Sequence, residues 1–244
     1  MIYAIFSDIH GNLEALTVAI NYIVDLGITD IICCGDITGY GPNPQECIQF
    51  LQRYSFVSVA GNHDRAIVKD SLGIYFNEDA VIALNIQKLN LNKKEIEYIK
   101  KLPKKINYSN FVVTHSSLDP KTPYRYVIDE NSARNTLAKT RKQIVFNGHS
   151  HIPTIFKLTD NRFETISAKD GLDMDLSDQS RYIINVGSVG QPRDGSPEIS
   201  FGLYDNISNI IRIVRLPYDF AKTQEKMKQM GFPEFLVYRI GFGV

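Results

Sequence analysis

Five short apolar segments of this chain are each followed directly by a small polar cluster, and these clusters contain all five histidines of the 244 residues. The clusters are Asp8-Ile9-His10, Gly35-Asp36, Gly61-Asn62-His63-Asp64, Thr114-His115 and Gly148-His149-Ser150-His151. Short apolar runs that end in small and polar residues are typical of buried strands. In a parallel sheet, residues just past successive strands meet at one carboxyl edge. The pattern therefore predicts one site built from segments far apart in the sequence.

Predicted helices separate the first strands. Apolar residues recur at three- and four-residue steps from Leu13 to Val24, and a second helix is expected to begin at Pro44. Such strand–helix units connect parallel strands. We expect strands at residues 2–6, 31–34, 56–60, 111–114 and 144–146, and helical segments at residues 77–102, interrupted near Asn92, and 131–140.

Beyond residue 153 the pattern changes to short strands separated by turn residues such as Asp160-Asn161. These strands are expected at residues 154–158, 162–166, 181–186, 199–204 and 210–214. They favour a second, antiparallel sheet built from hairpins, followed by a helix at residues 220–230. No linker or repeat divides the chain, so we expect a single α/β domain, residues 1–244, with two sheets and helices outside them.

Bulk composition excludes several classes of function. Lys+Arg and Asp+Glu number 27 each, so no global field favours nucleic acid or a membrane, and no extended nucleic-acid surface is expected. The first residues have no basic stretch, so no signal peptide is expected, and no apolar run is long enough to span a membrane. Three cysteines without a leader favour reduced thiols and a cytoplasmic location. Cys33 and Cys34 lie in an apolar run and are expected to be buried.

The polar clusters supply seven candidate metal ligands: Asp8, His10, Asp36, Asn62, His115, His149 and His151. In extended backbone Asp8 and His10 would point to the same side, although a helix cap beside a surface histidine explains that pair alone equally well. One cation takes about four to six ligands, so two metals sharing a bridging carboxylate fit the set better. Nitrogen and oxygen donors without thiolate favour Mn, Fe, Zn, Co or Ni over Ca or Mg.

In their order and number, these clusters resemble the motifs of the calcineurin-like metallophosphoesterase superfamily. Residues 35–42, Gly-Asp-Ile-Thr-Gly-Tyr-Gly-Pro, and residues 185–193, Asn-Val-Gly-Ser-Val-Gly-Gln-Pro-Arg, further resemble its small prokaryotic phosphodiesterase branch. The resemblance implies the metallo-dependent phosphatase fold, a four-layer αββα sandwich with two mixed β-sheets.

The resemblance also implies a role for each residue. One metal would be held by Asp8, His10 and His151, the second by Asn62, His115 and His149, with Asp36 bridging the two. His63 would be a catalytic residue that stabilises or protonates the leaving oxygen. Asp64 would either orient His63 or brace the loop. Asn12 is better explained as a helix cap.

Two departures from the family pattern carry information. The protein phosphatase branch continues its second motif into Asp-Arg-Gly, whereas residues 39–41 here are Gly-Tyr-Gly, which argues against a dedicated phosphoprotein phosphatase. Val186 replaces a proline that is usual in the small prokaryotic branch, a change expected to affect the loop more than the chemistry.

Arg193 could bind a phosphate with two hydrogen bonds or lie at the surface. Tyr40 is a second candidate substrate-binding residue.

We therefore expect a metal-dependent phosphodiesterase that hydrolyses a phosphodiester or phosphoanhydride by in-line attack of a metal-bridging hydroxide. The substrate would be small and phosphorylated, such as a cyclic nucleotide, a dinucleoside polyphosphate or a generic diester, and the chain is compatible with a homo-oligomer.

Two alternatives keep the same fold: a phosphomonoesterase for small metabolites, and a protein-interaction scaffold like the retromer subunit that resembles this family. Specificity is expected in the loops at residues 64–77 and 118–130, where aromatic side chains would either stack on a nucleobase or pack locally. These aromatic residues are Tyr40, Tyr75, Phe76, Tyr124 and Tyr126.

Overall fold

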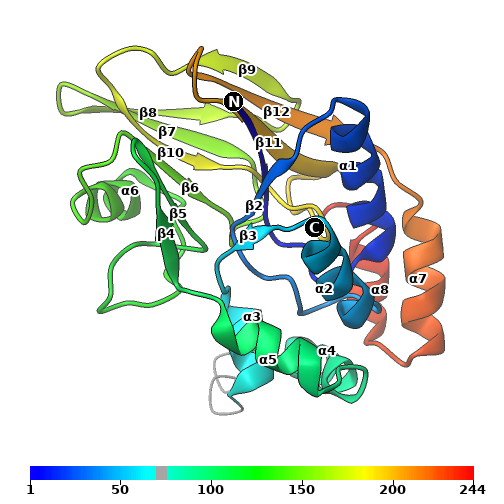
Figure 1. Cartoon of the computed structure of the whole chain (residues 1–244). Helices are drawn as coiled ribbons and strands as arrows, with labels where there is room; N and C mark the ends of the chain where they lie inside the picture. Colours follow the sequence, from blue (N-terminus) through cyan, green and yellow to red (C-terminus); the bar gives the residue numbers. More distant parts are fainter. Residues whose placement is uncertain (70–75) are drawn as a thin grey trace.

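The computed structural model describes residues 1–69 and 76–244, and its strands form two six-stranded sheets that pack face to face (Figure 1). The first sheet has the order β3 (Val57–Ser58), β2 (Asp30–Cys33), β1 (Ile2–Phe6), β11 (Ile199–Asp205), β12 (Ile210–Leu216) and β9 (Leu172–Asp175). The second has the order β4 (Lys105–Asn107), β5 (Phe111–Thr114), β6 (Ile144–Asn147), β10 (Arg181–Asn185), β7 (Thr154–Thr159) and β8 (Arg162–Ser167).

Helices cover the outer faces of both sheets (Figure 1). On the side of the first sheet lie α1 (Leu13–Asp25), α2 (Pro44–Arg53), α7 (Phe220–Gln229) and α8 (Glu234–Arg239), and on the side of the second lies α6 (Glu130–Leu137). At one end of the molecule α3 (Asn62–Val68), α4 (Glu78–Leu89) and α5 (Lys93–Lys101) gather into a group. Among the helices that the structure describes, none has the length and apolar character needed to cross a membrane.

The central strands are buried almost throughout, because successive side chains point to opposite faces and each sheet is covered on both faces. Ala4 of β1 belongs to the apolar cluster shared with α1 and α2, whereas its neighbour Ile5 belongs to the cluster between the sheets, together with Phe146 of β6. Val145, adjacent to Phe146, faces outward and shares a cluster with Leu137 of α6. The layers are therefore helix, sheet, sheet and helix, which confirms the four-layer αββα arrangement.

Both sheets are mixed, which confirms the two mixed sheets that the family resemblance implies, whereas the expectation that the strands after residue 153 form one antiparallel second sheet is wrong, because they are divided between the two sheets. β1 runs parallel to β2 and antiparallel to β11, while β10 runs parallel to β6 and antiparallel to β7. The strands expected to form one parallel sheet are divided, since β5 and β6 pair in the second sheet. A strand's apolar pattern shows that its faces are buried but does not specify its neighbour.

Most predicted elements occur close to their expected positions, with a few differences. The third strand shrinks from residues 56–60 to the two residues of β3, and α3 occupies the start of the loop expected at residues 64–77. Residues 70–75 of that loop, which include Tyr75, lie outside the described residues. β4, β9 and α8 were not predicted. Asn12 caps α1 by accepting a hydrogen bond from the Ala15 amide at 3.2 Å, as expected.

Candidate functional site

All seven predicted ligands meet where strands of both sheets end. Asp8 and His10 follow β1, Asp36 follows β2, and His115 follows β5. His149 and His151 follow β6, and Asn62 begins α3. All of these side chains are buried except that of Asn62, which is half-buried. The strands that carry the ligands belong to two different sheets, so the site forms only when the sheets pack together.

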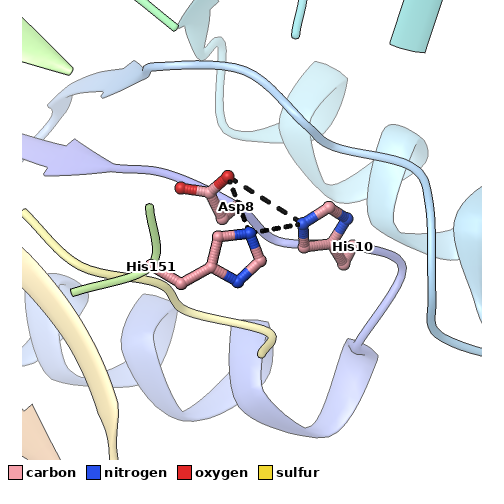
Figure 2. A group of neighbouring side chains, drawn as sticks. All are labelled: Asp8, His10 and His151. Carbon is pink, nitrogen blue, oxygen red and sulfur yellow. Dashed lines mark hydrogen bonds and ion pairs between the residues drawn. The ribbon is translucent and has the colours of Figure 1, made fainter. Parts of the chain in front are cut away.

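The first group of donors consists of Asp8, His10 and His151 (Figure 2). The Nε2 atoms of His10 and His151 lie 3.2 Å apart, and His151 Nε2 lies 3.4 Å from Asp8 Oδ1. His10 Nε2 lies 3.9 Å from the same carboxylate oxygen. The second oxygen, Oδ2, is held in place because it accepts a hydrogen bond from the His149 amide at 2.9 Å.

The second group of donors surrounds His115. Its Nε2 atom lies 3.0 Å from Asn62 Oδ1, 3.1 Å from His149 Nδ1 and 3.2 Å from Asp36 Oδ2. The same Asp36 oxygen lies 3.8 Å from His10 Nε2 of the first group. Asp36 is thus the carboxylate that lies between the two groups.

The outer hydrogen bonds of the histidines define which ring nitrogens carry hydrogen. His10 Nδ1 lies 2.8 Å from Thr38 O, His151 Nδ1 lies 2.5 Å from Gln191 O, His115 Nδ1 lies 2.9 Å from Cys34 O, and His149 Nε2 lies 2.8 Å from Tyr124 O. A carbonyl oxygen only accepts, so each of these nitrogens is the donor, and in a neutral ring the opposite nitrogen presents a lone pair to the site. Outer-shell bonds of this kind fix metal-ligating histidines in proteins.

These donors form a set that fits two cations. The inward atoms of the first group are lone-pair nitrogens and a carboxylate oxygen, which repel one another unless a positive charge lies between them. In the second group the charge of Asp36 raises the pKa of His115 to about 9, so a cation bound there would replace a proton. Asp8 Oδ1 is buried and has no hydrogen-bond partner among the described residues. Burial lowers the pKa of His149 to about 3 and those of His10 and His151 well below the usual value, so these rings are neutral.

The backbone at the site is unusual, because five of the seven ligands have positive φ angles. They are Asp8 (52°), His10 (51°), Asp36 (52°), His149 (70°) and His151 (61°). Non-glycine residues rarely adopt this conformation, and such strain concentrates at functional sites. Asp8 and His10 therefore converge as expected, but the expected cause, extended backbone, is wrong: β1 ends at Phe6, and a left-handed turn directs both side chains.

Two glycines make the close packing of these loops feasible. A Cβ atom on Gly61 would collide with Asp36 Oδ1, which accepts a hydrogen bond from the His63 amide at 2.9 Å. Gly39 has a φ of +137°, and a Cβ atom there would collide with the ring of His10. Only glycine allows the second and third loops to approach the ligands this closely.

His63 lies beside the ligands in an aromatic surrounding. Its ring centroid lies 4.5 Å from that of Tyr40, 4.5 Å from that of Phe76 and 4.9 Å from that of His10. His63 Nδ1 is buried and has no hydrogen-bond partner among the described residues. Burial lowers the pKa of His63 to about 4, although the charge of Asp36 opposes this shift.

Asp64 contacts the loop rather than His63. Its Oδ1 accepts hydrogen bonds from the amide and the hydroxyl of Thr38, both at 3.0 Å, and its Oδ2 accepts one from the Gly61 amide at 2.9 Å. These bonds join the second and third loops. They support the loop-bracing alternative for Asp64.

A cavity of about 840 Å³ opens beside the donors. Its walls include Asp36, His63, the two candidate substrate residues Tyr40 and Arg193, and Arg239 of α8. Three of the loop aromatics pack on other rings: Tyr40 and Phe76 on His63, and Tyr126 on His149 with centroids 4.0 Å apart. For these three, local packing is observed.

Two contacts that support the site were not predicted from the sequence. Gln87 of α4 is fully buried, accepts a hydrogen bond from the Gly39 amide at 2.7 Å and donates one to Gly41 O at 2.6 Å. Tyr124 has a φ of 61° and offers the carbonyl oxygen that orients His149. A glutamine in a helix and a carbonyl in a loop have no local sequence signal. Tyr124 was expected to act through its aromatic ring, not through its carbonyl oxygen.

Two packed mixed sheets between helices, with an aspartate, asparagine and histidine donor set at their shared edge, define a metallophosphoesterase. The chain belongs to the calcineurin-like phosphoesterase superfamily, whose domain model matches residues 1–208. This family depends on divalent metals, which agrees with the clustered donors.

Relatives and solved structures extend the similarity along the chain. The uncharacterized protein MJ0912 of Methanocaldococcus jannaschii is 36% identical over 247 residues, an alignment that covers 98% of this chain and 97% of the relative. The crystal structure of a metallophosphoesterase from Sphaerobacter thermophilus is 32% identical, covers 100% of both chains and superposes with a TM-score of 0.86. The hypothetical protein PH1004 from Pyrococcus horikoshii OT3 shares the fold, with a TM-score of 0.81 at 18% identity over 100% of this chain and 98% of that protein.

Proposed function

We propose that this protein is a binuclear metal-dependent phosphoesterase that hydrolyses a phosphodiester or phosphoanhydride bond in a small, nucleotide-type substrate. The observation that carries this proposal is the position of Asp36, whose Oδ2 atom lies 3.8 Å from His10 Nε2 and 3.2 Å from His115 Nε2. One buried carboxylate oxygen thus faces two otherwise separate groups of lone-pair donors, as a bridging ligand requires.

In this assignment, Asp8, His10 and His151 bind one ion, while Asn62, His115 and His149 bind the other. Asp36 is shared by both. Two divalent ions held together supply Lewis-acid polarisation of the phosphoryl oxygens and lower the pKa of a coordinated water. The chain's own contribution is rigidity, because every histidine donor is fixed by a hydrogen bond from its other ring nitrogen to a backbone carbonyl.

His63 is assigned to the leaving oxygen. Its Nδ1 atom, which has no hydrogen-bond partner within residues 1–69 and 76–244, lies in a ring that borders the cavity, next to both Asp36 and Tyr40. Because burial lowers its pKa to about 4, the ring enters the reaction neutral. This state favours donation of an N–H hydrogen bond to the developing negative charge over transfer of a full proton before bond cleavage.

The complete donor set supports a catalytic role over a scaffold on the same fold, since a binding scaffold has no need for buried acceptor groups that repel one another. The buried free thiols of Cys33, Cys34 and Cys47 agree with the proposed reducing, cytoplasmic location.

The proposal is tested with purified protein, manganese and bis-p-nitrophenyl phosphate. We expect turnover by the native chain and loss of more than about 100-fold in Asp36→Ala, since removal of even outer-shell partners of a metal typically costs up to that factor. Arg212→Ala on the distant face of β12 is the matched control and should retain full activity. Undiminished activity in Asp36→Ala would contradict the mechanism. Faster turnover of p-nitrophenyl phosphate than of the diester would favour the phosphomonoesterase alternative.

A further inference from the structure

Two arginines from distant parts of the sequence line the same cavity as the donors. Arg193 lies in the loop that follows β10, a central strand of the second sheet, and Arg239 is the last residue of α8. Arg239 lies beyond residues 1–208, the span that the family model matches. The C-terminal helix thus adds a charged side chain to a site whose other walls come from the matched domain.

Neither arginine is paired with an aspartate or glutamate side chain among the described residues. Arg193 donates to Gln191 Oε1 at 2.8 Å, and its buried Nε atom has no hydrogen-bond partner in the part of the chain that the structure describes. The neighbouring Asp194 is already engaged by Arg215, whose NH2 atom lies 3.3 Å from its Oδ1. Arg239 donates its Nε hydrogen to Val244 O. Of the described residues that line the cavity, Asp36 is the one acid, and it belongs to the donor groups.

Holding these two charges together costs free energy. Burial and the nearby charge of Arg193 lower the pKa of Arg239 to about 10, so the guanidinium stays charged at neutral pH. Two like charges in a partly desolvated cavity are unfavourable unless an anion joins them. The metal centre increases this positive charge, because two carboxylates, Asp8 and Asp36, do not neutralise two divalent ions.

The surrounding packing holds both side chains in position. Leu236 and Val237 of α8 share an apolar cluster with Tyr40 and with α4, so the helix that carries Arg239 is fixed to the second loop of the site. The Gly195 amide donates to Gly243 O at 2.9 Å, which ties the C-terminal segment to the Arg193 loop.

Each guanidinium also lies near an aromatic ring that limits its freedom. The Arg193 Cζ atom lies 5.6 Å from the Tyr40 ring centroid, and the Arg239 Cζ atom lies 5.1 Å from that of Phe235. Arginines placed over rings in this way are ordered before a ligand arrives, so less entropy is lost on binding.

We propose that Arg193 and Arg239 form a second anion subsite, which binds a further phosphate group of the substrate while the scissile phosphate lies at the metal centre. This inference rests on the proposed function and narrows its substrate class to molecules with at least two phosphoryl groups, such as nucleoside diphosphates, polyphosphates or their diesters. Planar guanidinium forks match phosphate oxygens with two hydrogen bonds each. A simple diester or monoester has no second anion for this subsite. The cavity of about 840 Å³ lies within the usual range for a ligand of nucleotide size.

The test compares the affinities of AMP and of the non-hydrolysable α,β-methylene analogue of ADP, measured by calorimetry on the manganese-loaded protein. We expect the native chain to bind the diphosphate analogue at least about tenfold more tightly, the gain typical of charge-assisted hydrogen bonds. Arg239→Met and Arg193→Met should each reduce that ratio several-fold. Arg239→Lys, which keeps the positive charge but lacks the planar guanidinium group, should give an intermediate affinity ratio. Arg212→Met removes an exposed arginine paired with Asp173 and should leave the ratio unchanged.

The diagnostic result is the change, from native chain to variant, in the ratio of the affinities for the diphosphate analogue and AMP. The ratio in the native chain is not diagnostic by itself, because the metals alone also prefer the more highly charged ligand. An unchanged ratio in both Arg239→Met and Arg193→Met, with native melting temperatures, would overturn the subsite. Affinity is measured without turnover, so the two proposals fail separately. Absence of hydrolysis by the native chain contradicts the proposed function, whereas hydrolysis with an arginine-independent ratio contradicts the subsite alone.

Discussion

The Nε2 atoms of His10 and His151 lie 3.2 Å apart, although the Nδ1 atom of each ring faces a backbone carbonyl oxygen and must carry the hydrogen. Two buried lone pairs therefore point at each other, with Asp8 Oδ1 as a third acceptor 3.4 Å from His151 Nε2. A cation turns this repulsion into coordination. The metal-free protein must instead accommodate it, and this relationship leads to the following predictions.

Removal of metal should destabilise the protein. An ion at 100 times its dissociation constant adds about 2.7 kcal/mol to the free energy of unfolding, which for a chain of this size raises the melting temperature by about 5–10 °C. We expect a decrease of that size on treatment with EDTA and recovery on addition of manganese, measured by differential scanning calorimetry. Calcium should restore less of the melting temperature than manganese does, because calcium prefers ligands that are all oxygen atoms. A melting temperature insensitive to EDTA would contradict a metal site.

Loss of Asp36 should remove more metal than loss of His10. Asp36 faces both donor groups, whereas His10 belongs chiefly to the group of Asp8 and His151. We expect elemental analysis of the dialysed protein to find close to two ions in the native chain, about one in His10→Ala and fewer than one in Asp36→Ala. Equal metal content in the two variants would argue against a bridging carboxylate.

The two sites should respond differently to pH. Although burial opposes it, the charge of Asp36 raises the pKa of His115 to about 9 in the metal-free protein. Below that pH a metal must displace a proton from His115, so affinity at this site should fall about tenfold for each pH unit between 9 and 7. In the first group, burial keeps His10 and His151 unprotonated and raises the pKa of Asp8 to about 7, so affinity there should fall only below pH 7.

Titration of manganese at pH 7, 8 and 9 measures both affinities. We expect the affinity of the His115 site to increase with pH over this range and the affinity of the other site to stay constant. His115→Gln retains a neutral acceptor without a titrating ring and should abolish the increase. Two affinities that change in parallel would contradict the separate assignment.

Replacement of His63 should lower turnover without loss of metal. In the proposed role this ring acts on the leaving oxygen, and such groups typically contribute about 10²–10⁴-fold to rate. We expect His63→Gln to reduce kcat on bis-p-nitrophenyl phosphate by this amount, while elemental analysis still finds the native metal content. Metal loss equal to that of Asp36→Ala would instead make His63 a ligand.

Gln87→Leu should destabilise the protein and impair catalysis together. The substitution leaves the Gly39 amide and the Gly41 carbonyl without their buried partner, at about 1–3 kcal/mol for each group. Tyr40 lies between these glycines and packs on His63, so kcat should fall as well. Gln229→Leu, an exposed glutamine on α7, is the control and should change neither quantity. Normal turnover in a destabilised Gln87→Leu would limit its role to stability.

Local pattern sufficed for much of the fold, because strands and helices depend on periodicity and on capping residues close in sequence. β1 occurs at the predicted residues 2–6, and Asn12 caps α1 as expected. The limits of β3 and the start of α3 at Asn62 were not predicted, since the polar cluster there resembles a loop in composition. The short α8 was missed because one and a half turns contain too little periodicity to detect.

By itself, the sequence determined which side chains are available to the site, since histidine, aspartate and asparagine after apolar strands are visible in the order of residues alone. Only the tertiary structure decided how they meet: which strands share a sheet, the left-handed backbone that turns Asp8 and His10 inward, and the entry of Arg239 into the cavity. The physical reason is that these features depend on contacts between segments far apart in the sequence, such as the bonds that Asp8 makes with Gly35 and with Ser188. Such contacts follow from the packing of two sheets against each other, and no local pattern encodes them.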